Sequence, residues 1–108
     1  MIENNFTIIK SDKRLVKLNF DQISIIKGLG NYVEIFMTDD RKFVYYKSLK
    51  ELIDKLPDEF MRVHNSYIIN LKNVEYFEDN QLIIGKNKIA VAKSYKYCLL
   101  ESIDKLLL

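Results

Sequence analysis

The amino-acid sequence predicts a single, mainly β domain with short helices, and three observations carry this prediction. The chain has 108 residues, which is enough for one domain with a real core but not for two. Hydrophobic residues make up 48% of it, with only three glycines and one proline, which is a globular rather than a disordered composition. Short β-branched or alternating runs, separated by polar turns, recur along most of its length.

The first part of the chain predicts five short strands. They are Phe6 to Lys10, Arg14 to Phe20, Ile23 to Lys27, Tyr32 to Thr38 and Lys42 to Tyr46. Within the fourth strand Val33, Ile35 and Met37 alternate with the other residues, so we expect these three on one face. The pair Asp39-Asp40 predicts a turn that joins the last two strands into a hairpin.

Residues Ser48 to Leu56 predict the first helix. Ser48 and Glu51 have the spacing of a capping box, in which each side chain accepts a hydrogen bond from the other residue's backbone amide. One helical face is apolar, and it carries Leu49, Leu52, Ile53 and Leu56. Pro57 ends the helix, because proline cannot continue it.

The rest of the chain predicts three more strands and a second helix. The strands are Val74 to Glu78, Gln81 to Ile84 and Lys88 to Ala92. We expect the helix to open at Ser94, with Leu99, Ile103 and Leu106 on its inner stripe. Residues 1–5 are expected to form a polar leader, and residues 6–108 one domain.

Several classes of protein are disfavoured by composition. No apolar run approaches the roughly 20 residues needed to cross a bilayer, and no signal pattern begins the chain. We therefore expect no membrane partner and a cytoplasmic location. The single Cys98 lies in the apolar run Tyr97-Cys98-Leu99-Leu100, so we expect a buried packing thiol.

The charged residues are segregated, although the net charge is only +2. Four windows contain no acid, and they are Gln22 to Val33, Arg41 to Lys50, Phe60 to Val74 and Asn80 to Leu100. Such segregation favours one positive face, as a polyanion binder needs. The alternative is that the basic residues are distributed by chance.

The segment Phe60 to Leu71 is the most informative. It interleaves Arg62, His64, Asn65 and Ser66 with apolar residues and contains no acid. This pattern suits a surface that recognises polar edges, whereas an ordinary polar turn between two strands is the alternative.

Catalysis and metal binding find little support. One histidine and one cysteine are too few ligands for a metal centre, and Ser66 and His64 lie too close on one strand for a nucleophile and its base. Gly28-Leu29-Gly30 lacks the third glycine of a phosphate-binding loop. We therefore expect no catalytic residues, no metal and no cofactor.

Four blocks of the sequence together resemble the LytTR family of bacterial DNA-binding domains, usually the output half of response regulators. In order, they are Gly30-Asn31-Tyr32-Val33-Glu34-Ile35, Ser48-Leu49-Lys50-Glu51-Leu52, Phe60-Met61-Arg62-Val63-His64-Asn65-Ser66-Tyr67-Ile68-Ile69-Asn70 and Ile89-Ala90-Val91-Ala92-Lys93-Ser94-Tyr95-Lys96. The resemblance extends over residues 6–103, and the core Arg-Val-His-x-Ser-Tyr-x-x-Asn is its most specific part.

The resemblance implies about ten strands in stacked antiparallel sheets, and no helix-turn-helix. Members insert loops into successive major grooves of double-stranded DNA and usually bend it. By motif position the base-contacting residues are Asn31, Asn65 and Lys93. The family commonly has arginine at the third position, and lysine keeps its charge without the bidentate fork that grips guanine. An amide at Asn65 favours adenine, which offers a paired donor and acceptor.

Basic and polar side chains near these positions are expected to contact the DNA backbone. They are Arg62, His64, Ser66, Lys86, Lys88 and Lys96. Two alternatives stay open: a role of Asn31 in a left-handed backbone, and a role of His64 as a partly buried residue that holds its loop. Tyr67, Ile69 and Leu71 are expected mostly in the core.

The sequence therefore predicts a sequence-specific DNA-binding domain that acts in transcription regulation. The resemblance implies a monomer off DNA, two copies on direct-repeat sites and a receiver domain preceding this module in a full-length protein. Two other functions stay open: a protein-interaction or ligand-sensing β-domain without DNA binding, and a small enzyme that uses His64.

Overall fold

The computed structural model describes residues 4–108, which are mainly β. The strands are β1 (Phe6–Ser11), β2 (Arg14–Asn19), β3 (Ile23–Leu29), β4 (Tyr32–Met37), β5 (Lys42–Tyr45), β6 (Phe60–His64), β7 (Tyr67–Asn70), β8 (Tyr76–Glu78), β9 (Gln81–Ile84) and β10 (Asn87–Ala90). The helices are α1 (Leu49–Ile53) and α2 (Lys93–Asp104), and Phe20–Gln22 and Leu71–Asn73 form single 3-10 turns. The predicted fold class is confirmed within these residues.

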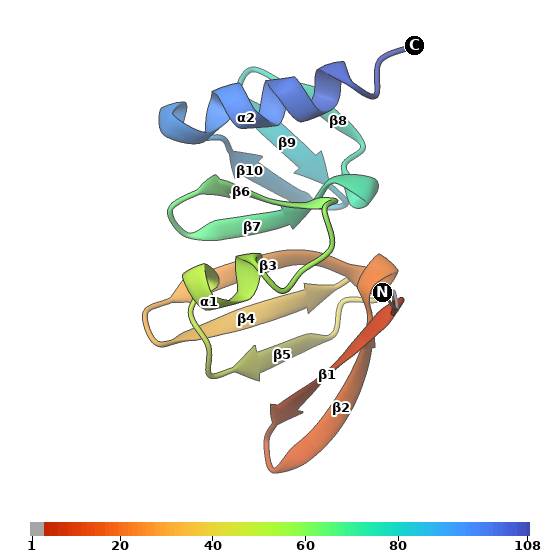
Figure 1. The fold of residues 1–108 in the computed structure, drawn as a ribbon, viewed down its shortest axis with the longest axis vertical. Helices are drawn as coiled ribbons and strands as arrows, with labels where there is room; N and C mark the ends of the chain where they lie inside the picture. Colours follow the sequence, from red (N-terminus) through yellow and green to blue (C-terminus); the bar gives the residue numbers. More distant parts are fainter. Residues whose placement is uncertain (1–3) are drawn as a thin grey trace.

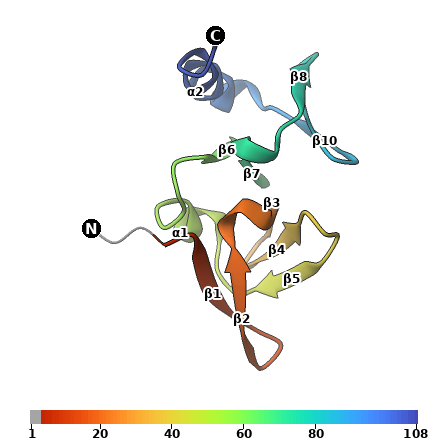
Figure 2. The same cartoon turned by 90° about the vertical axis from the view of Figure 1, so that its right-hand side faces the viewer.

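The ten strands of the described part form three antiparallel sheets. The central sheet has the order β5-β4-β3-β7-β6, and smaller sheets are made by β1-β2 and by β10-β9-β8. The sheets follow one another along the longest axis, which measures 41 Å (Figures 1 and 2). The central sheet therefore lies between the other two.

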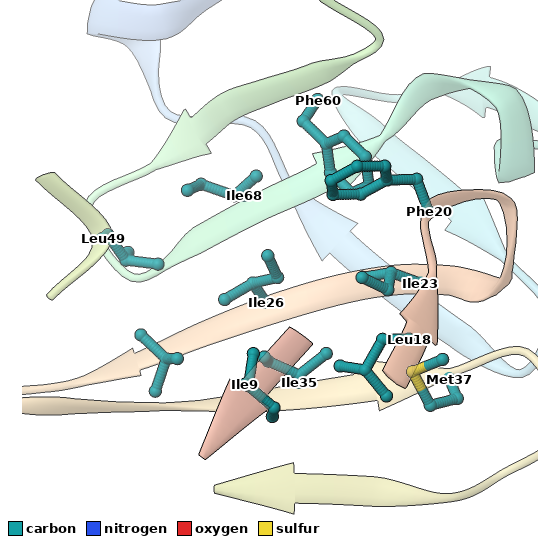
Figure 3. Packing of buried hydrophobic residues seen from close by; sticks show 11 residues of the cluster. Ile9, Leu18, Phe20, Ile23, Ile26, Ile35, Met37, Leu49, Phe60 and Ile68 are labelled. Atoms are coloured by element: carbon teal, nitrogen blue, oxygen red, sulfur yellow. The ribbon is translucent and has the colours of Figure 1, made fainter. Parts of the chain in front are cut away.

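One core fills the space between the central sheet, the β1-β2 hairpin and α1. Ile26 on β3 and Ile68 on β7 meet Leu18 of β2 and Leu49 of α1 there (Figure 3). Leu49 packs tightly over β3, since a Cβ built on Gly28 would lie 2.8 Å from a terminal methyl of Leu49. This close approach fixes the start of α1 against β3.

A second core lies on the opposite face of the same sheet. Ile25 and Ile69 pack there with Leu82 of β9 and Leu99 of α2. Because successive strand residues point to opposite faces, neighbouring isoleucines on β3 and on β7 serve different cores. This explains why β7 is buried from Ile68 to Asn70.

The buried Asn70 is held by hydrogen bonds rather than by packing alone. Its Nδ2 donates to the carbonyl oxygens of Phe20 (3.2 Å) and Ile23 (2.9 Å). Its Oδ1 accepts from the Lys72 backbone amide at 3.0 Å. Asn70, the last residue of the Arg-Val-His-x-Ser-Tyr-x-x-Asn core, therefore has a structural role, because it ties β7 to the start of β3.

The helices differ in detail from their predictions. The capping box of α1 is present, but α1 ends at Ile53 instead of Leu56. Helix α2 begins at Lys93, with Ala92 as its N-cap, and ends before Leu106, which is 71% exposed. The prediction of a buried Cys98 is wrong: Leu99 takes the inward position, and one helical step of about 100° leaves Cys98 exposed.

The predicted strands agree with the structure to within one or two residues at most ends. Ile69 is buried, as expected, whereas Tyr67 and Leu71 are only partly buried against the second core. Residues 1–3 of the predicted leader lie outside the described residues, and the Asn5 carbonyl accepts a hydrogen bond from the Phe20 amide at 2.9 Å. Residues 4–108 contain no helix with the length and apolar character needed to cross a membrane.

Candidate nucleic-acid interface

The β3-β4 and β6-β7 turns lie side by side at one edge of the central sheet. Strand β3 pairs with β4 as far as Leu29 and Tyr32, and with β7 as far as Lys27 and Tyr67. The Gly28 amide then donates to the Ser66 carbonyl at 2.8 Å, beyond the last paired residues. This hydrogen bond joins the two turns directly.

A bulge in β6 brings the start of α2 to the same edge. Arg62 pairs with Ile68 and His64 with Tyr67, so Val63 is the extra residue. The Val63 carbonyl accepts a hydrogen bond from the Ala92 amide at 2.9 Å. Because Ala92 caps α2, this contact fixes the first turn of α2 beside the β6-β7 turn.

The segment between β5 and α1 completes the edge. The rings of Tyr32 and Tyr46 lie 5.6 Å apart, and Tyr46 is 74% exposed. We call the four segments together the turn edge, and they are Gly30–Asn31, Tyr46–Ser48, Asn65–Ser66 and Lys93–Lys96. All four lie on the left-hand side of Figure 1.

The four segments of the turn edge contain no acidic residue, because each comes from one of the acid-free windows, and the Glu51 carboxylate lies at its border, bound to the Ser48 amide. The opposite ends of the same strands carry acids, which are Asp21, Asp39, Asp40, Asp58 and Glu59. There the charges of Glu59 and Asp21, 3.7 and 3.4 Å from the Lys72 ammonium, raise the pKa of Lys72. Acidic side chains therefore gather at the end of the sheet opposite to the turn edge, although the net charge of the chain is only +2.

The three predicted base-contacting residues come together on this edge. Asn31, Asn65 and Lys93 are all exposed, each from a different segment. Gly30 adopts the left-handed conformation (φ +76°), so the alternative that Asn31 serves a left-handed backbone is wrong. A glycine with positive φ at the first central position is typical of a type II′ hairpin turn, which leaves the Asn31 side chain free to project.

Arg62, His64 and Ser66 stabilise the β6-β7 turn from within. The Arg62 Nη2 donates to the Asn65 carbonyl at 2.8 Å, and the Ser66 amide donates to the His64 Nδ1 at 3.0 Å. His64 is partly buried, and its ring lies 5.5 Å from that of Tyr67. The hydrogen bond from Ser66 to His64 agrees with the alternative that His64 holds its loop.

The predicted lysines are distributed unequally. Lys96 lies in the first turn of α2, on the turn edge, and Lys88 is exposed on β10, the strand that leads to this edge. Lys86 lies elsewhere: it lines a hollow with Thr38 and Asp40, at the other end of β4. Six strand residues, or about 20 Å, separate that end from Asn31, so the structure does not bring Lys86 to the turn edge.

Two tyrosines at the turn edge escaped the sequence prediction. Tyr46 lies in an acid-free window, which is the signal that points to it. Tyr95 lies partly buried in α2, and its hydroxyl donates to the Asn65 Oδ1 at 3.0 Å. Thirty residues separate these partners, so no local pattern connects them. Within residues 4–108 no three Asp, Glu, His or Cys side chains gather as metal ligands would.

Comparison with known proteins identifies the family. The sequence profile of the LytTr DNA-binding domain matches residues 13–104. Accessory gene regulator protein A of Staphylococcus aureus is 41% identical over 82 residues, 74% of this chain and 34% of that protein. The protein of the same name from Staphylococcus epidermidis is 36% identical over 93 residues, 82% of this chain and 39% of that protein.

A solved structure shares the fold. A LytTr DNA-binding domain from Bacillus cereus superposes with a TM-score of 0.79 at 18% identity, covering 94% of this chain and 98% of its own. The chain spans about a third of the length of the Staphylococcus aureus relative. Because the profile matches most of the chain, the protein belongs to the LytTR family of DNA-binding domains.

Proposed function

We propose that this chain binds double-stranded DNA sequence-specifically, through the turn edge, and so acts in transcription regulation. One observation carries the proposal: the four acid-free windows meet at a single edge, where Asn31, Asn65 and Lys93 are exposed together. Phosphates repel carboxylates, so the acid-free segments that hold Asn31, Asn65 and Lys93 let a duplex approach closely there. Membership of a family of DNA-binding domains supports the same function.

Asn31, Asn65 and Lys93 are the proposed base contacts. Asn31 and Asn65 lie on hairpin turns, and Lys93 is the first residue of α2. We propose that these three segments enter the major grooves. The molecule measures 41 Å along its longest axis, and one turn of B-DNA measures about 34 Å. The three segments come from neighbouring strands and the adjoining start of α2, so we propose that bending of the duplex toward the edge brings successive major grooves within their reach.

Contacts to phosphates supply most of the affinity. The α2 N-cap, Ala92, has no side chain that could accept from the first amides of the helix, and free amides at a helix start bind phosphate. Lys96, in the same helical turn, adds a positive charge, and Lys88 adds one along β10. Arg62, His64 and Ser66 act mainly by fixing the turn, with their outward atoms available to the backbone.

The chain is proposed to be the DNA-binding part of a longer regulator. Its Staphylococcus aureus relative is about three times as long as the matched region, and a receiver domain preceding this module accounts for such a length. Two copies are proposed to occupy direct-repeat sites, with a monomer off DNA. Since the proposed function is to bind chromosomal DNA, we propose that the protein acts in the cytoplasm.

Selection from a random duplex pool, followed by fluorescence anisotropy at increasing salt, tests the function. We expect enrichment of one sequence and an affinity that falls steeply as salt rises, because bound phosphates release counterions. An affinity for the selected duplex that does not change with salt, or a pool without enrichment, would contradict sequence-specific DNA binding.

Lys93→Ala, compared with Lys86→Ala, tests the edge. Both remove one exposed lysine, but only Lys93 lies on the turn edge. We expect Lys93→Ala to weaken binding of the selected duplex by about 1–3 kcal/mol and to relax preference at one base pair. Lys86→Ala should keep near wild-type affinity. Equal losses in the two variants would remove Lys93 from the base-contacting role.

A further inference from the structure

Asn65 is held in one orientation by two neighbours. The Arg62 Nη2 donates to its backbone carbonyl at 2.8 Å, and the Tyr95 hydroxyl donates to its side-chain Oδ1 at 3.0 Å. The Arg62 guanidinium lies over the Tyr95 ring, 5.9 Å from its centroid. Arg62 and Tyr95 are both partly buried, whereas Asn65 is exposed. The exposed Asn65 is thus fixed by Arg62 and Tyr95, which also contact each other.

The hydrogen bond from Tyr95 determines what Asn65 presents. An asparagine amide has one acceptor oxygen and one nitrogen with two donor hydrogens. Since the oxygen is engaged by Tyr95, the nitrogen is the group left to interact outward. The oxygen keeps a second lone pair, so the bond biases the side chain toward donating without forbidding it to accept.

We infer that Tyr95 is a positioning residue that sets the base preference of Asn65, an inference that rests on the proposed DNA binding. A bidentate contact to adenine needs the amide oxygen as acceptor and the nitrogen as donor. An amide biased toward donating matches the two acceptors of guanine, N7 and O6. Tyr95 therefore moves the preference from adenine toward guanine, which revises the adenine preference expected from the residue type.

Tyr95→Phe isolates the hydroxyl, because it keeps the ring beneath Arg62. Tyr97→Phe is the matched control, since Tyr97 is the neighbouring tyrosine of α2 and is 75% exposed. In the free protein, ¹H–¹⁵N spectra report the side-chain amide of Asn65. We expect this resonance pair to shift in Tyr95→Phe, while those of Asn31 and Asn70 stay in place. Tyr97→Phe should leave all three unchanged.

Binding of the selected duplex and its single-base variants then measures the preference. At the base pair that Asn65→Ala identifies, Tyr95→Phe should reduce the preference for guanine over adenine by about fivefold, the value of one hydrogen bond. Affinity for random duplex should not change. In an Asn65→Ala background, Tyr95→Phe should have no further effect, because Tyr95 acts through Asn65.

Three results would overturn the positioning role. They are an unshifted Asn65 amide in Tyr95→Phe, an equal loss of affinity for all duplexes, and an undiminished effect in the Asn65→Ala background, which would make Tyr95 a DNA contact itself. Failure of the wild type to bind any duplex would instead overturn the proposed function and with it the base preference. The spectra of the free protein separate the two failures.

Discussion

Asn70 is a polar side chain at the centre of the molecule, and its hydrogen bonds explain why it is tolerated there. It is fully buried, yet its amide donates to two carbonyls and accepts from one backbone amide. Burying an amide is costly when its partners are missing and nearly neutral when they are present. The contribution of this residue therefore resides in three contacts, made to Phe20, Ile23 and Lys72.

Asn70→Ala should lower the free energy of unfolding by about 2–4 kcal/mol, because it leaves a small cavity and unpaired backbone groups. Urea denaturation measures the change. Asn87→Ala is a suitable control, since Asn87 is exposed at the start of β10 and should change stability by less than about 0.5 kcal/mol. Equal effects for both variants would show that the Asn70 contacts contribute little.

At the scale of elements, α1 has only five residues and depends on its ends. A helix this short is not stable in water by itself. Ser48 Oγ accepts from the Glu51 amide at 3.2 Å, and Glu51 Oε1 accepts from the Ser48 amide at 3.0 Å. The Ser48 amide, followed by the Ser48 hydroxyl and the charges of Lys47 and Lys55, lowers the pKa of the Glu51 carboxyl.

Comparison of the wild type with Glu51→Gln at several pH values should show how much the Glu51 charge contributes to stability. Glutamine keeps the size and the acceptor oxygen, so the two proteins differ by the carboxylate alone. Since folding lowers the pKa of Glu51, its stabilisation is fully present above about pH 4.5 and is lost as pH falls through the lowered value. The lead of the wild type in urea midpoint should therefore shrink under acid. A lead that stays constant down to pH 3 would contradict the prediction.

The sequence predicts the helices and strands better than the tertiary contacts between them. Strand alternation and the capping box are local patterns, so Val33, Ile35, Met37 and the start of α1 follow from them. The hydrogen bond of the Ala92 amide to the Val63 carbonyl and the contact between Tyr95 and Asn65 join residues about thirty positions apart. Cys98 was predicted wrongly because an apolar run does not reveal which residue of a helix faces inward.

At the scale of the whole molecule, the two cores share one sheet. The first core lies against one face of β3 and β7, and the second lies against the other face. Loss of either core exposes the sheet on which the other depends. We therefore expect the described domain to unfold as one cooperative unit.

Leu18→Ala and Leu99→Ala test this coupling, since each leucine is fully buried in a different core. Each should cost about 2–5 kcal/mol. Both should lower the midpoint of one shared transition, followed by far-ultraviolet circular dichroism and by tyrosine fluorescence. Two separate transitions in either variant would show that the cores unfold independently.

The candidate interface also belongs to this scale, and the sequence predicted its content better than its shape. The positions of the acidic residues along the chain were enough to locate the acid-free windows. Their convergence on one edge depends on the strand order β5-β4-β3-β7-β6. Lys86 shows the limit: it lies in the same window as Lys93, yet the β9-β10 turn carries it to the opposite end.

The identical neighbours Ile68 and Ile69 leave β7 with an ambiguity. If β7 slipped by one position along β3, one isoleucine would take the place of the other in one hydrophobic layer, so the isoleucines alone specify the pairing only weakly. Asn70 removes this ambiguity. Displacement by one step would carry its amide away from the carbonyls of Phe20 and Ile23 and into an oily environment. The pairing frame of the strand that begins at the candidate DNA-binding turn is thus encoded by a polar residue at its far end.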